Sequence, residues 1–395
     1  FDPIKQEEFY SLSAYFSDID EFGLYSHFTF STPTPAMLLY QGGQRQQHDA
    51  ARQVIAESEQ ELSATLQAAR EKWAARPEDL IEKLPTPRQH AFSAPLEGDA
   101  EGVVGNAKVC NGDDAIDCKE APLFGRTSVF SYSLWVKPAS HRPRMVVLHL
   151  SRAAEDSAFR GLELTIDDGH PQFSMIHFWP GNAMRVRALE EIPANVWTHL
   201  AVTHDGSGRA EGVQLFLNGM ATDVKVIRDG LTRDIRQRAE WGDLDIGKVN
   251  LSLGARFRDI GFRGGAVDDL KVFDVQLSSA EVAAIYRAVR PDPAAAGVTP
   301  ALALQHQLLT ADETVDRARA SLANARDAEN ELVTSIREIM TMRHFAGAPP
   351  THVLGRGEYL IKGEQVSPST PDLAGGLPAA GTDRLSLAKW MTDPG

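Results

Sequence analysis

The spacing of apolar residues changes twice along the chain, and the changes separate two helical flanks from a β-rich middle. In residues 44–77 and again in residues 300–344, apolar or small side chains recur mostly at alternating steps of four and three, which is the seam of a coiled-coil helix. The pattern predicts one helix over residues 44–84 and another over residues 300–343. The first seam comprises Ala51, Ile55, Leu62, Leu66, Ala69 and Trp73, with Ser58 filling one gap; the second comprises Leu308, Ala311, Val315, Ala318, Leu322, Ala325, Leu332, Ile336 and Ile339.

Neither helix can bury its apolar stripe alone, and the middle of the chain separates the two in sequence. We therefore expect one antiparallel coiled-coil hairpin that carries the central domain at its tip, as a spacer arm of roughly 50 Å. The alternative is that the two helices pack separately on a globular core.

From residue 92 to residue 287 the period becomes two, and short apolar runs alternate with Asp-Gly and Asn-Gly turns. This pattern predicts a β-sandwich of more than ten strands, so the fold class is mainly β with α. Asn218-Gly219 is a strong hairpin signal because a type I′ turn requires positive φ at both central positions. The clearest predicted strands are residues 131–138, 145–150, 161–166, 171–178, 197–203 and 212–217.

Composition and charge restrict the function. The chain has 395 residues, 43% of them hydrophobic, and a net charge of −14, which repels nucleic acid and anionic membranes unless a local basic patch overrides it. No such patch is evident along the sequence. No run of apolar residues could span a bilayer, and two cysteines cannot form a disulfide framework. The chain starts at Phe1-Asp2 without an initiator Met, which is typical of an internal cut.

A series of motifs in the middle of the chain carries a resemblance to a known family. They are residues 130–138 (FSYSLWVKP), 197–206 (WTHLAVTHDG), 213–219 (VQLFLNG), 244–247 (LDIG) and 262–273 (FRGGAVDDLKVF), closed by 277–282 (LSSAEV). In this order they resemble the laminin-G-like, concanavalin A-like jelly-roll family. The resemblance implies that residues 92–287 form one such sandwich.

The outer segments carry a second resemblance. Residues 2–16 (DPIKQEEFYSLSAYF), 350–366 (PTHVLGRGEYLIKGEQV) and 384–390 (RLSLAKW) resemble the large cytochrome c-like proteins of planctomycetes. That resemblance implies that residues 1–40 end a first conserved domain, that residues 344–395 begin a second, and that the protein is periplasmic or at the cell surface. Many members insert a laminin-G-like domain between two helices, and residues 173–186 look like that domain in particular.

In that family a Cys-x-x-Cys-His haem motif lies just before the segment that opens this chain. Neither Cys110 nor Cys118 belongs to such a motif. We therefore expect haem c only if the motif is present upstream in the full protein.

The sequence favours no catalytic role. Hydrolases of the concanavalin-like fold need two neighbouring carboxylates, but Glu163 with Asp167 and Asp243 with Asp245 form no tight acidic cluster and read as solvated surface carboxylates. Asp243 and Asp245 are expected on a strand whose Leu244 and Ile246 face the core. No Gly-x-Ser-x-Gly elbow accompanies the histidines at positions 199 and 204, which are expected to pack.

Calcium is a possible cofactor, because jelly-rolls of this type often hold one Ca²⁺ between their first and last strands with hard oxygen ligands. Asp99 near the start of the domain and Asp268 and Asp269 near its end could meet there. The alternative is that Asp269 caps a turn and Asp99 is solvated.

A ligand face is predicted at His177, Trp179, Asn182 and Arg185, where an aromatic ring, a cation and an amide could stack on a sugar and bond its hydroxyls. The alternative is that the aromatic residue only braces a turn. The leading hypothesis is a non-catalytic recognition module for a glycan or a protein. Its rival is a scaffold within a haem-containing redox or polysaccharide-processing assembly.

Residues 1–40 and 343–395 are expected to pack together, because an antiparallel hairpin brings its outer ends side by side. Each segment has apolar residues to cover and is too short for a core of its own. Part of their apolar surface should await missing parts of the same polypeptide or another chain. The residues concerned are Phe9, Leu12 and Phe16 in one segment and Val353, Leu354, Leu385, Leu387 and Trp390 in the other.

Overall fold

The computed structural model describes residues 3–19, 25–98, 100–291, 298–343, 350–372 and 382–393. The chain divides into two compact units, one formed by Phe1–Gly23 with Met340–Gly395 and the other by Leu24–Ile339. Along the described parts of the chain, no helix combines the length and the apolar character that a membrane span needs.

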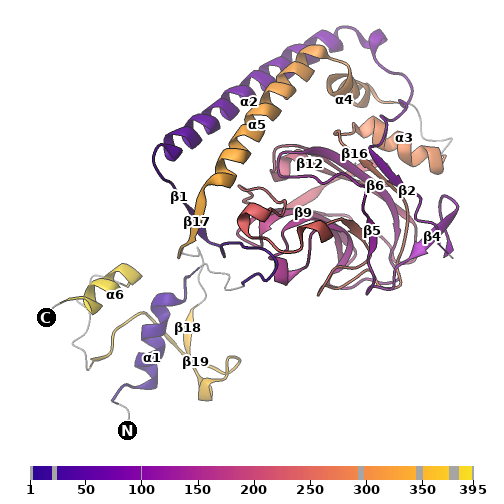
Figure 1. Cartoon of the computed structure of the whole chain (residues 1–395). Coiled ribbons are helices and arrows are strands. Elements are labelled where there is room, and N and C mark those ends of the chain that lie inside the picture. The colour runs from indigo at the N-terminus through magenta and orange to yellow at the C-terminus, as the bar shows by residue number, and fades with distance from the viewer. Residues whose placement is uncertain are drawn as a thin grey trace. The chain divides into compact units, whose positions relative to one another are not determined.

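The larger unit is built on a β-sandwich of one seven-stranded and one eight-stranded sheet (Figure 1). The seven-stranded sheet has the order β14 (Val224–Asp229), β10 (Asn182–Ala188), β9 (His170–Phe178), β8 (Gly161–Asp167), β7 (Met145–Leu150), β15 (Leu251–Leu253) and β5 (Ile116–Cys118). The eight-stranded sheet has the order β13 (Met220–Thr222), β12 (Val213–Leu217), β11 (Thr198–Asp205), β6 (Val129–Lys137), β16 (Ala266–Phe273), β4 (Asn106–Val109) and β3 (Ala100–Glu101), and β2 (Phe92–Ala94) also pairs with β16.

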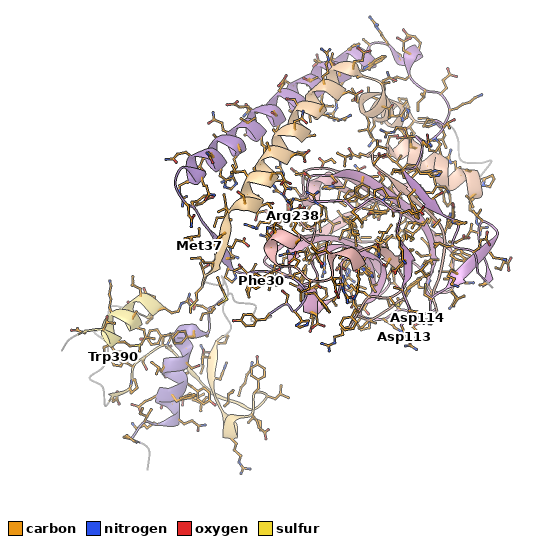
Figure 2. The ribbon with its side chains drawn as sticks, in the orientation of Figure 1. Phe30, Met37, Asp113, Asp114, Arg238 and Trp390 are labelled. Carbon is orange, nitrogen blue, oxygen red and sulfur yellow. The ribbon has the colours of Figure 1, made fainter. Side chains whose placement is uncertain are left out.

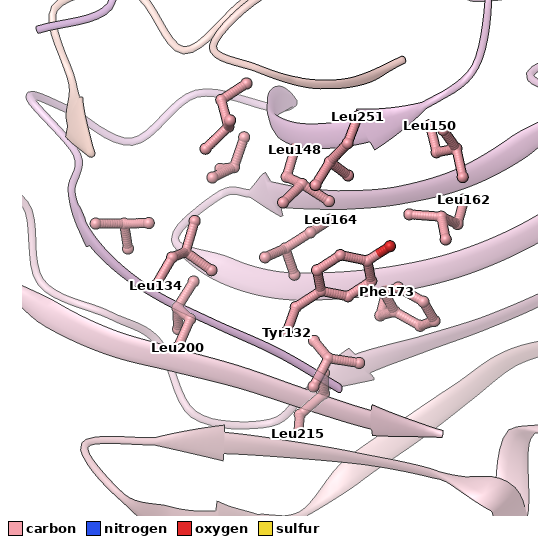
Figure 3. Packing of buried hydrophobic residues seen from close by; sticks show 14 of the residues in the cluster. Tyr132, Leu134, Leu148, Leu150, Leu162, Leu164, Phe173, Leu200, Leu215 and Leu251 are labelled. Carbon is pink, nitrogen blue, oxygen red and sulfur yellow. The ribbon is translucent and has the colours of Figure 1, made fainter. Parts of the chain in front are cut away.

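The inner faces of the two sheets form one hydrophobic core. Alternate residues of each strand point inward, as a period of two requires, and Figure 3 shows leucines of both sheets closing around Tyr132 and Phe173. The predicted sandwich is therefore confirmed, and the six predicted strands match β6, β7, β8, β9, β11 and β12. Asn218 and Gly219 have φ of 50° and 81°, as the expected hairpin turn between β12 and β13 requires.

Helix α3 (Ser279–Val289) covers part of the outer face of the eight-stranded sheet. Its Val282 and Ile285 pack against Phe216 of β12 and Phe273 of β16. Ser278 caps the helix by accepting a hydrogen bond from the backbone N–H of Glu281.

Helices α2 (Gln44–Ala74) and α5 (Glu313–Ser335) lie side by side and antiparallel (Figure 1). Near one end of the pair, His48 Nε2 lies 2.9 Å from Glu329 Oε1. Near the other end, Trp73 Nε1 donates to Asp312 Oδ2 at 2.7 Å. Of the three buried residues of α2, Ser58 and Ala69 belong to the predicted seam and His48 does not.

The prediction of one continuous second helix is wrong. Asp312 caps α5 by accepting hydrogen bonds from the N–H groups of Thr314 and Val315, so the chain breaks between α4 (Pro300–Thr310) and α5. Helix α5 ends at Ser335, and β17 (Arg337–Met340) then pairs with β1 (Ala36–Leu39).

Nor do the helices hold the sandwich away as a spacer arm. Arg126, at the entry to β6, forms an ion pair with Glu329 of α5, and Arg326 of α5 donates to the carbonyl oxygen of Asp205 at 3.3 Å. Arg238, marked in Figure 2, donates to both Asp234 (2.7 Å) and Glu331 of α5 (2.8 Å). Charged side chains along the helix pair therefore bind the sandwich directly.

Short 3-10 turns occupy Pro77–Asp79, Glu155–Ser157, Ala210–Gly212, Ala239–Trp241 and Ile246–Lys248.

The smaller unit joins both ends of the chain. It contains α1 (Gln6–Ser13), a 3-10 turn (Ala14–Phe16), the hairpin of β18 (Thr351–Leu354) and β19 (Lys362–Val366) around a 3-10 turn (Gly355–Gly357), and α6 (Arg384–Met391). The N–H of Ser369 donates to the carbonyl oxygen of Ser11 (3.2 Å), and Arg384 pairs with Asp18. The buried residues include Tyr15 and Leu387, whereas Phe9, Phe16 and Leu385 remain exposed. The two ends thus associate with part of their apolar surface uncovered, but residues 24–40 of the predicted first segment belong to the larger unit.

Candidate functional site

A row of polar side chains crosses the outer face of the seven-stranded sheet. Each member stands opposite the next in the strand register, so all of them project to the same side of the sheet. The row consists of Arg228, Arg185, Ser174, Glu163, His149, Ser252 and Asp117.

Glu163 lies at the centre of this row and is fully buried. Its carboxylate accepts hydrogen bonds from Nη2 of Arg144 (2.9 Å), of Arg185 (2.7 Å) and of Arg256 (2.7 Å). Burial alone would raise the pKa of Glu163, but the positive charges of Arg256, Arg144 and Arg185 outweigh it and lower the pKa. The expectation of a solvated surface carboxylate is therefore wrong, because the three cations that surround Glu163 come from distant parts of the sequence.

Trp179 and Arg185 come together at the exposed edge of this cluster. The guanidinium carbon of Arg185 lies 3.6 Å from the centroid of the Trp179 indole, which is a cation–π contact. Nε of Arg185 also donates to Ser174 Oγ at 2.7 Å, so the guanidinium is held from two sides. The Trp179 and Arg185 side chains both stay partly exposed.

His177 and Asn182, the other two predicted ligand residues, lie inside the protein. Nδ1–H of His177 donates to the carbonyl oxygen of Asp234 at 2.7 Å, and burial together with Arg160 lowers the pKa of His177. Asn182 Nδ2 donates to Thr232 Oγ1 at 2.9 Å, and Asn182 Oδ1 accepts from the N–H of Thr232 at 2.9 Å. Both residues therefore fasten the segment that follows β14 and contains Thr232 and Asp234.

Of the three predicted metal ligands, Asp268 has a free oxygen. Oδ2 of Asp268 accepts from the N–H groups of Val103 (2.6 Å) and Val104 (2.9 Å), whereas Oδ1 is buried and has no hydrogen-bond partner among the described residues. Burial raises the pKa of Asp268, as expected for a carboxylate that lacks a cation. Asp269 instead pairs with Lys271, and Asp99 lies outside the described residues.

The unpartnered Oδ1 of Asp268 fits a hard cation such as Ca²⁺. Within the described ranges, however, no group of three acidic, His or Cys side chains could hold a metal. Backbone carbonyl oxygens would have to complete such a site.

The two carboxylates after β14 are also placed differently from the prediction. Asp243 is buried and pairs with Arg160 at 3.0 Å, while Asp245 accepts from Arg152 at 3.1 Å. Leu244 is exposed, because the segment turns through two 3-10 turns instead of forming a strand.

The thiols and strand histidines are structural. Burial raises the pKa of the Cys110 thiol to about 12 and that of Cys118 to about 11, so neither is a reactive nucleophile at neutral pH. His199 and His204 are fully buried in β11, as expected for packing residues.

Comparison with known proteins identifies the central fold. Residues 111–283 match the model of a family described as the Concanavalin A-like lectin/glucanases superfamily (Laminin_G_3), so the sandwich is a laminin-G-like, concanavalin A-like domain. No curated protein matches the chain.

Similar solved structures include the CBM40 domain of a Ruminococcus gnavus IT-sialidase bound to α2,3-sialyllactose, at 14% identity over 50% of this chain and 100% of that chain, with a TM-score of 0.37. Another is the receptor-binding domain of botulinum neurotoxin D, at 13% identity over 54% of this chain and 53% of that chain, with a TM-score of 0.34. A third is a mutant of the NanB sialidase from Streptococcus pneumoniae, at 13% identity over 51% of this chain and 28% of that chain, with a TM-score of 0.33.

Proposed function

We propose that the sandwich is a non-catalytic module that binds a glycan on the outer face of its seven-stranded sheet, with Trp179 and Arg185 at the centre of the site. The observation that carries this proposal is the stacked Trp179–Arg185 pair, which is partly exposed and anchored from below by Glu163 and Ser174.

This pair supplies the two kinds of contact that sugars use. The apolar C–H face of a sugar ring stacks on an indole, and N–H groups of a guanidinium donate to hydroxyl or carboxylate oxygens. Glu163 and Ser174 hold the Arg185 guanidinium in place before any ligand arrives. The side chain therefore loses less conformational entropy when a ligand binds. A preformed aromatic and polar platform is therefore present at the surface.

The buried carboxylate beneath the site does not support hydrolysis. A general acid needs a pKa raised toward the working pH, whereas three arginines lower the pKa of Glu163. Its role in this proposal is to position Arg185 and Arg144.

The test replaces the aromatic platform. We expect Trp179→Ala to abolish retention on the glycan matrices that hold the wild-type protein, within a panel of neutral and acidic polysaccharides. Trp197→Ala is the matched control, because Trp197 is also partly exposed and lies near a cation, with Lys137 Nζ at 5.9 Å from its ring, but it precedes a strand of the other sheet. Retention unchanged by Trp179→Ala, or no retention of the wild type on any matrix, would contradict the proposal.

We also propose that Ca²⁺ binds at Asp268 through Oδ1, the carboxylate oxygen that has no partner in the described part of the chain. A ligand that binds only the folded state raises the melting temperature. Millimolar calcium should therefore raise the Tm above its value in excess chelator, and Asp268→Asn should remove the difference. An identical wild-type melt in both conditions rules out the site.

The resemblance of the outer segments supports a proposal about the whole protein: an exported planctomycete cytochrome c-like protein that displays this module in the periplasm or at the cell surface. The rival proposal makes the sandwich a scaffold in a haem-containing redox or polysaccharide-processing assembly. Absorption spectra of the full-length gene product distinguish the two if they are recorded with and without the bound polysaccharide, because only the rival ties the module to the haem.

A further inference from the structure

Four cations share the outer face of the sheet where β10 and β14 pair. Arg185 stands opposite Arg228, and Arg187 stands opposite Lys225. The residues between them on β10, Met184, Val186 and Ala188, are buried in the core, so the four basic side chains project away from it. We define these four residues as the basic rectangle.

The basic rectangle is compact, although a register shift between Arg185 and Val186 places its β14 members, Lys225 and Arg228, three residues apart. Arg185 and Arg187 are two residues apart on one strand, a rise of about 6.6 to 6.8 Å, and directly opposed residues on neighbouring strands have Cβ atoms about 4.5 to 5.5 Å apart. The strand pairing therefore creates a compact array of like charges, although about 40 positions separate Arg185 from Lys225 and Arg228 in the sequence. The expectation that the protein has no basic patch is wrong for this reason.

The protein neutralises one of the four charges, that of Arg185, through Glu163. Like charges placed directly opposite each other destabilise a sheet. Yet among the residues with a described position, no carboxylate forms an ion pair with Arg187, Lys225 or Arg228, although the chain contains 54 acidic residues. Arg187 donates only to the backbone carbonyl oxygen of Asp167, at 3.3 Å.

The positive charge continues beneath Trp179. Three guanidinium groups, those of Arg144, Arg185 and Arg256, face only two carboxylates, those of Glu163 and Asp259. In the part of the chain that is described, Nη1 of Arg144 and Nη1 of Arg185 have no hydrogen-bond partner, and both side chains are partly exposed, at 22% and 12%. These N–H groups are available to an anion from outside.

Protection of a sheet edge does not account for the array. Charged residues on an edge strand prevent edge-to-edge association, and β14 is an edge strand. However, Arg185 and Arg187 lie on β10, one strand in from the edge, and mixed charges would protect the edge without the repulsion.

We infer that the ligand of this face is a polyanionic glycan, with carboxylate or sulfate groups repeated along its chain, and that the basic rectangle binds those groups while Trp179 stacks on a sugar ring. This inference rests on the proposed glycan-binding function and specifies its substrate class. A polymer that repeats its anionic groups can contact several neighbouring cations at once, which a single small anion cannot do. A nucleic acid suits the face less well, because single strands are held by several aromatic residues on which successive bases stack, whereas the proposed site is centred on a single indole, that of Trp179.

The experiment reverses the two exposed cations of β14. The double variant Lys225→Glu/Arg228→Glu changes the net charge by four units and removes no buried contact. Lys83→Glu/Lys119→Glu changes the net charge by the same amount at two exposed positions and is the matched control, since Lys83 precedes the sandwich and Lys119 follows β5, the edge strand opposite β14. The probes are polygalacturonate, heparin, neutral dextran and a single-stranded DNA oligonucleotide, with Kd measured at several salt concentrations and thermal melts confirming that each variant is folded.

We expect the wild type to bind polygalacturonate or heparin with a Kd that rises with salt, and the β14 variant to bind about tenfold or more weakly, whereas the control stays within about twofold. Binding to dextran alone, lost in Trp179→Ala, would overturn the polyanionic ligand and leave the proposed function standing. Binding to none of the glycans would overturn both. The inference would also be overturned if both double variants bound the acidic glycans equally weakly. If the protein bound DNA as tightly as it binds the acidic glycans, the ligand of this face would instead be a nucleic acid.

Discussion

On the outer face of the eight-stranded sheet, Phe216 and Phe273 are buried under helix α3, and this face contributes to stability as a second small core. On the outer face of the seven-stranded sheet, the corresponding positions hold Glu163, its arginines and the basic rectangle. Both sheets share one inner core, so the difference lies only in what each strand places on its outward positions. An outer face that a helix covers can be apolar, whereas one that meets a polar ligand must keep its charges fixed but accessible.

The largest loss of stability should come from a substitution on the outer face of the eight-stranded sheet, which α3 covers. Phe216→Ala leaves a cavity beneath α3, and the free energy of unfolding should fall by about 3 to 5 kcal/mol in urea denaturation at 25 °C. Glycan retention should be unchanged, because the other outer face is intact. A loss below about 1 kcal/mol would mean that α3 does not depend on this contact.

A somewhat smaller loss is expected at the centre of the charged face. Glu163→Gln leaves three guanidinium groups without their shared carboxylate. Because Arg144 and Arg185 are partly exposed, the loss should lie near the low end of what a broken buried ion pair costs, at about 3 kcal/mol. Asp167→Asn, at the partly exposed end of the same strand, is the control and should stay within about 1 kcal/mol. A cost for Glu163→Gln no larger than that of the control would show that the arginines do not need the carboxylate.

The Glu163 contribution should also depend on pH. Its pKa is lower in the folded protein than the value of 4.5 expected in the unfolded chain, so its stabilising effect is complete above that value and disappears as the pH falls toward the lowered pKa. The difference in stability between wild type and Glu163→Gln should therefore shrink on acidification below about pH 4.5, as urea titrations at pH 7, 4 and 3 would reveal. If the difference in stability between wild type and Glu163→Gln stayed constant from pH 7 to pH 3, the carboxylate of Glu163 would not be responsible for it.

The smallest effect is expected at the rim of the charged face. Lys225→Ser removes an exposed cation opposite Arg187, so the Tm should stay the same or rise slightly as repulsion is relieved, corresponding to about 0.5 kcal/mol at most. Calorimetric melts of the wild type and of Lys225→Ser at low salt would measure this change in Tm. A clear fall in Tm would indicate that Lys225 has a stabilising partner and is not held for a ligand.

Features set by local pattern were predictable from the sequence. The strands around Leu134, Leu148 and Leu164, the Asn218-Gly219 turn and the α2 seam through Ser58 and Ala69 all depend on residues close in sequence. These are the features that hydrophobic period and turn chemistry specify.

Features that depend on strand pairing could not be read in the same way. Glu163 looks solvated until β7, β10 and the loop after β15 bring Arg144, Arg185 and Arg256 to it. The basic rectangle likewise exists only because a register places Lys225 opposite Arg187. Of the candidate site, the Trp179–Arg185 pair was predictable, since both residues belong to one strand–turn–strand segment.

The antiparallel contact between α2 and α5 has a consequence for the order in which the protein folds. His48 and Glu329 are 281 positions apart in sequence, and closing a flexible loop of that length costs about 5 kcal/mol of chain entropy before any constant term. Once the sandwich has formed, β2 lies against β16, so Phe92 and Val272 are neighbours and most of that loop is already closed.

The helices then need to close only the two short connections that flank the sandwich, which reduces the entropic barrier by roughly 1 kcal/mol. Helix α2 is made early on the ribosome, but its stripe of Leu62, Leu66 and Ala69 can be covered only once α4 and α5 have been made. We therefore expect the helices to pair after the sandwich has folded, and a nascent chain truncated before α4 would expose that stripe to chaperones.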